Sequence, residues 1–477
     1  MYLDARNNSD SDGNSDGSSK IQDRSLNIIG KISYQTKKTS NDEIIEDSTP
    51  ATASAIASDG GVLQEQNDEQ AVYHNLSPQY ITQTIDKSPL VELYQNKEKE
   101  SALSSVNLIY CAHNPEAQGF ELLQQDAPLE EVRGFVKDRL IQAFVTMERL
   151  VGEEKMGSYG VCSNGLGLAS SHPMHLGWED MLDASAEAAR EVHGFDCGRK
   201  DNHFSTVQLP ANLLERHGLK VANRIKQFLA SPDADKIGGM AMVDGIQIHA
   251  TRPLTCYPDR GTGTGHPFKL VDYEISTVED GSEKNWSHLI KSAPAFYTSI
   301  LNETMGHFDA SHLIEIKGGE ERELTMEERE TLDGCKLLQS MIHDLDANLS
   351  SGKLRSLAAY EEDLYNKVVP LIHETFEELD GDSAGILQRF FQAHGVAVRH
   401  SIAKTTRELL KAGGDGVEKY DIPDDMTLQG FSLRFLMEQK CEGDFMQGPL
   451  IDRVVVGCPR LEHVIEAVQF TDQAKIS

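Results

Sequence analysis

The sequence lacks paired cysteines, long apolar runs and an excess of positive charge, and each absence excludes a class of protein. Its seven cysteines are an odd number, and no two of them stand as CxxC, so neither a disulfide framework nor a zinc ribbon is indicated. No apolar run approaches the roughly 20 residues of a membrane span. The segment 1–19 contains no apolar core for a signal peptide. We therefore expect a reduced, cytoplasmic protein without a membrane segment.

The charge balance is strongly acidic. The net charge of -31 argues against binding to a nucleic-acid backbone or an anionic membrane, because both reward clustered cations. With 477 residues, 39% of them hydrophobic, the chain is long enough for two or three ordinary domains or for one barrel with insertions.

Apolar segments that predict buried strands alternate with segments of helical periodicity. In the helical segments the apolar residues recur every three or four positions, as in a helix with one buried face. This alternation is typical of a parallel α/β fold. The predicted strands are 26–34, 106–112, 158–164, 204–210, 245–254 and 452–459, and helices are expected at 77–90, 129–154, 178–192, 212–231 and 386–412.

Composition divides the chain further. Polar, aromatic-poor stretches predict a mobile N-terminal segment and a disordered insertion, and the α/β alternation breaks between 258 and 385, where helical patterns dominate. The predicted organisation is a mobile segment 1–25, barrel strands three to seven over 26–257 with the insertion 36–72, a helical insertion 258–385, the C-terminal part of the barrel 386–470 and a tail 471–477.

The predicted strands end in polar or small residues. His113 follows the strand 106–112 and is itself followed by Asn114-Pro115, which stops the strand. A histidine at this place is either a satisfied residue at the strand end or a residue that faces a ligand. In a parallel α/β barrel all strand carboxyl ends share one rim, and that rim carries the active site.

Three local patterns resemble ligand sites but lack essential parts. His172 and His175 have no carboxylate or cysteine fixed nearby in the sequence, so we expect no metal site there. The stretch 379–386 begins like a calcium loop, but Phe391 occupies the position of the bidentate glutamate. The run GTGTG at 261–265 lacks the spacing of a nucleotide-binding loop.

The motifs LIYCAHNPE, KMGSYGVCSNG, TVQLPANLLE, ATRPL and VVVGCP follow one another in the order of strands four to eight of the aldo/keto reductases. The resemblance covers roughly 70–255 and 415–470. It implies a (β/α)8 TIM barrel that transfers hydride between NADP(H) and a carbonyl or alcohol substrate of the aldose or aldehyde type. NAD is the alternative cofactor. It gives no oligomeric state.

The resemblance also implies roles for individual residues. His113 matches the histidine that orients the substrate carbonyl, Lys31 matches the catalytic lysine, and Tyr2 is the candidate for the proton-donating tyrosine. Residues expected to bind the cofactor are Ser163, Asn164, Gln208, Arg252, Gly457, Cys458, Arg460 and His463.

The sequence departs from the family at several places, among them Gly457 in place of a phosphate-binding lysine and His463 in place of an arginine. The first two strands and the aspartate that pairs with the lysine have no counterpart before Tyr2, and Thr251 stands where an aromatic residue usually stacks on the nicotinamide. Two interpretations stay open. The sequence is either an incomplete piece of an active reductase or a degenerate barrel that binds nucleotide or a partner without turnover.

Overall fold

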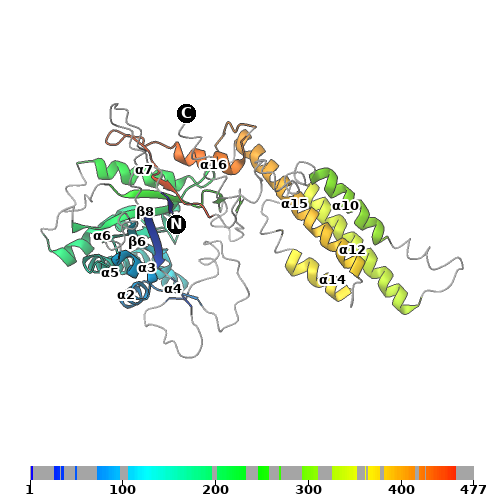
Figure 1. Ribbon diagram of the computed structural model, residues 1–477, viewed down its shortest axis with the longest axis horizontal. Helices are drawn as coiled ribbons and strands as arrows, with labels where there is room; N and C mark the ends of the chain where they lie inside the picture. Colours follow the sequence, from blue (N-terminus) through cyan, green and yellow to red (C-terminus); the bar gives the residue numbers. More distant parts are fainter. Residues whose placement is uncertain are drawn as a thin grey trace. The chain divides into compact units, whose positions relative to one another are not determined.

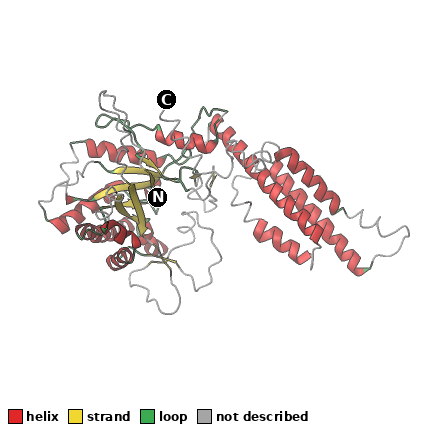
Figure 2. Cartoon of the chain, in the orientation of Figure 1, coloured by secondary structure: helices red, strands yellow, loops and turns green. Residues whose placement is uncertain are grey.

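The computed structural model divides the chain into two compact units (Figures 1 and 2). The first unit comprises 1–211, 215–251 and 436–455, and the second comprises 212–214, 252–435 and 456–477. The structure describes residues 2–3, 26–32, 34–36, 49–50, 72–96, 106–195, 201–232, 245–256, 268–269, 293–309, 325–351, 360, 364–375, 381–413, 418–424 and 426–457.

Six parallel strands of the first unit form one sheet that is curled into a half-barrel. Along the sheet they follow their order in the sequence, and a seventh strand, β1 (Tyr2–Leu3), pairs antiparallel with the outer edge of β2. The parallel strands are β2 (Leu26–Ile32), β6 (Val106–His113), β7 (Ser158–Cys162), β8 (Phe204–Pro210), β9 (Gln247–Thr251) and β12 (Arg453–Val454). The α/β class and the parallel strand order predicted from the sequence are thus confirmed.

Helices cover the outer face of this sheet (Figure 1). The side chain of Tyr110 on β6 points toward them, since its hydroxyl donates to Ser88 Oγ at 2.6 Å. Tyr159 on β7 packs against Phe144 and Phe204, with ring centroids 5.2 to 5.7 Å apart. The helices of this unit are α2 (Pro78–Asp86), α3 (Pro89–Gln95), α4 (Phe120–Gln124), α5 (Leu129–Gly152), α6 (Trp178–His193) and α7 (His217–Ala230).

The helix expected over 77–90 is two helices. Ser77 caps α2 through a hydrogen bond from the Tyr80 amide, as its sequence position predicts. Pro89 disfavours a helical conformation at Ser88, and Ser88 instead caps α3 by accepting from the Leu90 amide. The chain therefore turns between Asp86 and Pro89, where the apolar spacing alone predicts continuity.

A polar contact crosses the inner face of the half-barrel, which is the face turned away from the helices. With the amide of Asn27 oriented so that its oxygen faces the guanidinium, this oxygen accepts from both Nη atoms of Arg453, at 2.8 and 2.6 Å. Asn27 lies on β2 and Arg453 on β12, the first and last of the parallel strands. The pair thus fixes the curvature of the sheet.

The second unit is built from helices, and α10, α12 and α15 lie side by side in it (Figures 1 and 2). The rings of Tyr297, Phe390 and His394 contact one another in its interior, with centroids 5.5 to 6.3 Å apart and tilted or edge-to-face planes. Its helices include α10 (Ala293–His307), α12 (Met326–Ser350), α14 (Val369–Thr375) and α15 (Gly381–Ala412); α16 (Leu428–Met437) runs from this unit into the first.

The sequence places a boundary at residue 385, which falls inside α15. Residues 252–435 all belong to the second unit, and within it α15 packs against α10 and α12, which precede it in the chain. Most of the predicted mobile segment 1–25 and of the predicted disordered insertion 36–72 lies outside the described residues, as do the run 261–265 and all residues after 457. The parts of the two predicted segments that the structure describes are strand residues: β1 (Tyr2–Leu3), β4 (Thr49–Pro50), Thr36 and Val72. In the described part of the chain, no helix combines the length and apolar content that a membrane crossing requires.

Candidate functional site

A row of side chains crosses the inner face of the half-barrel, from the last residue of β6 to the first residue of β12. Strand register aligns His113 with Cys162, Cys162 with Gln208, Gln208 with His249, and His249 with Arg453. Aligned residues of neighbouring strands point to the same face of a sheet. These five side chains therefore face the interior of the half-barrel together, and two of them, His113 and Gln208, are site residues predicted from the sequence.

His113 is almost fully buried, and a second histidine holds its backbone. His74, at the end of β5 (Val72–His74), contacts the His113 carbonyl oxygen through Nε2 at 2.7 Å. Gln118 Nε2 donates to His74 Nδ1 at 2.7 Å, so Nδ1 is the acceptor and Nε2 carries the proton. Burial lowers the pKa of His74 to about 4. His74 is therefore a neutral donor that fixes the end of β6.

The turn after His113 links two strand ends. Asn114 adopts the left-handed conformation with φ 48°, which asparagine tolerates better than most residues. Its amide donates to the Cys162 carbonyl at 2.7 Å, and its side-chain oxygen accepts from the Asn164 amide at 3.2 Å. The Asn-Pro pair thus ends the strand as predicted and also anchors the loop that carries Ser163 and Asn164.

A buried carboxyl group supports the same loop. Glu116, in the short helix Pro115–Gly119, accepts from the Ser163 hydroxyl at 2.7 Å and from the Gly165 amide at 2.8 Å. Burial raises the pKa of Glu116, although the bond from Ser163 opposes this shift. The hydroxyl proton of Ser163 is thereby committed to Glu116, so the oxygen of Ser163 is oriented by the protein itself.

Gln208 presents an unsatisfied acceptor. The side chain is fully buried on the inner face, and its Nε2 lies 3.5 Å from His249 Nδ1. Its Oε1 is also buried, and none of the described residues donates a hydrogen bond to it. A buried carbonyl oxygen without a donor costs about 1–3 kcal/mol. The primary amide of a nicotinamide carries the kind of donor that would satisfy this oxygen, so the residue fits the expected cofactor at this point.

Lys31 and Tyr2 occupy different ends of the sheet edge. Lys31 is exposed on β2 and aligns with Cys111, two residues before His113. Tyr2 pairs with Asn27, which aligns with Asn107, six residues before His113. Six strand residues span about 20 Å. The structure thus brings Lys31 near the end that carries His113, and it holds the backbone of Tyr2 at the opposite end.

None of the remaining predicted cofactor residues that the structure describes is aligned with this row. Arg252 belongs to the second unit and has a φ of 54°, and the exposed Gly457 also belongs to that unit. Thr251 ends β9 and is buried. Cys458, Arg460 and His463 lie outside the described residues.

Three supporting residues escape analysis of the sequence alone. His74 is 39 residues from His113, and Glu116 is 47 residues from Ser163, so no local pattern connects them. Gln118 contacts His74 over 44 residues. The only sequence signal is that Glu116 and Gln118 follow the strand end immediately, where functional loops commonly begin.

No protein-family model matches the chain, and neither a curated protein nor a solved structure is significantly similar to it.

Proposed function

We propose that this protein is an aldo/keto reductase-like oxidoreductase whose half-barrel is part of a (β/α)8 barrel, and that its inner row binds NADP(H) and a carbonyl or alcohol substrate. The single observation that carries the proposal is the buried, unsatisfied Oε1 of Gln208, aligned through Cys162 with His113. The aligned strand ends and the resemblance of their motifs support the same assignment.

The residues of the row have distinct tasks in this proposal. Gln208 Oε1 accepts from the carboxamide, while the Ser163-Asn164 loop, fixed by Glu116 and Asn114, orients the ring. The bound cofactor supplies or accepts the hydride. The imidazole of His113 donates a hydrogen bond to the substrate carbonyl, where negative charge develops, and the proton that this oxygen takes up is assigned to Tyr2, as the resemblance implies.

A second candidate is nucleotide binding without turnover. The register that places Tyr2 opposite Asn27 favours it, because the residue expected to donate the proton starts far from the end of β6. The two candidates share the binding site and differ only in catalysis.

Isothermal titration of the full chain with NADPH tests the shared site. We expect binding that Gln208→Met weakens at least tenfold, since the methionine removes the acceptor but keeps the volume. Gln83→Met, at an exposed position of α2, is the matched control and should bind as the wild type does. Absence of NADPH and NADH binding, or equal binding by Gln208→Met, would refute both candidates.

Turnover separates the two. NADPH oxidation with a panel of aldoses and aromatic aldehydes should be detectable, and His113→Gln should lower kcat at least 100-fold while NADPH binding is retained. NADPH binding without turnover of any carbonyl by the wild type selects the second candidate.

A further inference from the structure

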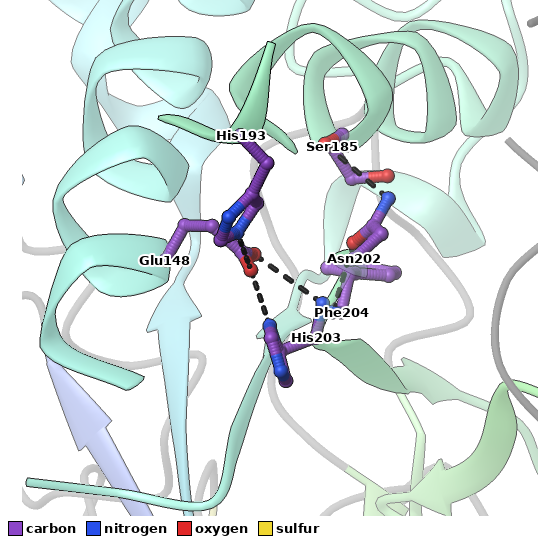
Figure 3. A network of polar contacts seen from close by, with 6 residues as sticks. All are labelled: Glu148, Ser185, His193, Asn202, His203 and Phe204. Atoms are coloured by element: carbon purple, nitrogen blue, oxygen red, sulfur yellow. Dashed lines mark hydrogen bonds and ion pairs between the residues drawn. The ribbon is translucent and has the colours of Figure 1, made fainter. Parts of the chain in front are cut away.

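Three side chains of types that bind metal ions, one glutamate and two histidines, meet near the start of β8 (Figure 3). Glu148 lies on α5 and is completely buried. His193 is the last residue of α6, and His203 directly precedes β8. The three residues come from separate elements of the first unit, so only the fold brings them together.

Both imidazoles aim at one carboxylate oxygen. His193 Nε2 lies 3.0 Å from Glu148 Oε1, and His203 Nδ1 contacts the same oxygen. One ligand atom from each residue lies within 4.8 Å of the other two. Ligands bound to Zn²⁺ at about 2.0–2.1 Å in a tetrahedral site stand about 3.3 Å apart. Small movements of the two rings would therefore make room for an ion between them and the carboxylate.

The carboxylate at the centre of the cluster is withdrawn from solvent. Glu148 is completely buried, and both imidazoles contact it. A buried carboxylate needs a partner that compensates its charge, and an ion held between it and the two imidazoles would supply that compensation.

The two histidines leave the cluster open to solvent. Their side chains are 28% and 33% exposed, whereas that of Glu148 is 0% exposed. The His203 amide donates to Glu148 Oε2 at 3.3 Å. Asn202 ties the same segment to α6 by donating to the Ser185 carbonyl at 3.4 Å, and it accepts from the Phe204 amide at 3.0 Å (Figure 3). An ion therefore has access from solvent to ligands that stand on a fixed backbone.

We propose that Glu148, His193 and His203 bind one divalent transition-metal ion of the zinc type, with water completing its coordination. Two imidazoles and a carboxylate are a ligand set that Zn²⁺ takes in proteins. His203 precedes Gln208 by five residues, or about 16 Å along the strand. The ion is thus a structural clip between α5, α6 and the start of β8, and it acts independently of the proposed reductase site.

The test is titration of the chelator-treated full chain with ZnCl₂ by calorimetry, together with thermal unfolding. We expect one tight site per chain and a higher Tm with Zn²⁺. His193→Ala and His203→Ala should each weaken binding at least tenfold and abolish the Tm shift. His343→Ala is the matched control, since this histidine is exposed on α12 in the second unit.

Should His203→Ala fail to fold, His193→Ala decides, because its side chain ends a helix and is partly exposed. With Co²⁺ as a probe, the wild type should show visible ligand-field bands that His193→Ala lacks. The proposal is overturned if His193→Ala binds Zn²⁺ within tenfold of the wild type, or if the wild type binds none.

Discussion

The imidazole of His74 donates from Nε2 to the backbone carbonyl of His113 at 2.7 Å, and it accepts from Gln118 through Nδ1. This arrangement requires a neutral ring. It links β5 to the end of β6, so the residue proposed to face the substrate is held by a histidine that touches no substrate in the proposed mechanism.

The neutral state of His74 predicts a pH dependence of stability. Its pKa is about 4 in the folded protein, compared with an ordinary value of 6.5, so between these values the unfolded state binds more protons. The free energy of unfolding therefore falls as the pH drops through this window, by about 2 kcal/mol between pH 7 and pH 5.

Urea unfolding of the wild type and of His74→Gln at both pH values measures this contribution. In His74→Gln, the change in unfolding free energy between pH 7 and pH 5 should be about 2 kcal/mol smaller than in the wild type. His343→Gln, at an exposed position of α12, should show the same change as the wild type. An unchanged pH dependence in His74→Gln would show that another group is responsible.

Replacing the buried Glu116 should affect both stability and NADPH binding, whereas replacing an exposed glutamate should affect neither. Glu116→Gln replaces an acceptor oxygen with an NH₂ group that faces either the Ser163 hydroxyl or the Gly165 amide. We expect a loss of stability of about 1–3 kcal/mol and weaker NADPH binding. Glu121→Gln, exposed on α4, is the control and should change neither quantity in calorimetry and urea unfolding.

Lys226 and Asp452 form a buried ion pair at 2.9 Å. Asp452 also accepts from the Ile248 amide at 2.8 Å, so the pair joins α7 and the segment before β12 to β9. Lys226→Met leaves the carboxylate buried without its cation, and we expect a loss of about 3–5 kcal/mol in urea unfolding.

The exposed pair Lys336–Asp333 provides the contrast, because Lys336→Met should cost less than about 1 kcal/mol. Equal losses in the two variants would mean that burial does not determine the strength of these pairs in this protein.

Gly160 is required for the contact between β7 and β8. A Cβ atom there would lie 2.2 Å from the Thr206 carbonyl oxygen, so Gly160→Ala must push the strands apart. We expect a strong loss of stability, of at least about 2 kcal/mol, by thermal or urea unfolding. Gly134→Ala on α5, where a Cβ would meet no atom within 4 Å, should instead stabilise the protein by about 0.5–1 kcal/mol. A mild effect of Gly160→Ala would show that this strand pair adapts.

Much of the fold follows from local patterns. The strands around Val106–His113 and Phe204–Pro210 are continuous apolar runs, which predict burial between layers, and the periodicity of Leu129–Gly152 predicts one long helix. Pro89 shows the limit of such patterns, because a backbone restriction at Ser88 outweighs the apolar spacing.

By itself, the sequence determined the parallel α/β class, the strand order and the presence of His113 and Gln208 near the ends of their strands, because these depend on periodicity and chain direction. Only the tertiary structure decided the contacts of His74 with His113 and of Glu148 with His193 and His203. It also placed the backbone of Tyr2 opposite Asn27. These contacts join residues dozens of positions apart, or depend on strand register, and they are set by the packing of whole elements.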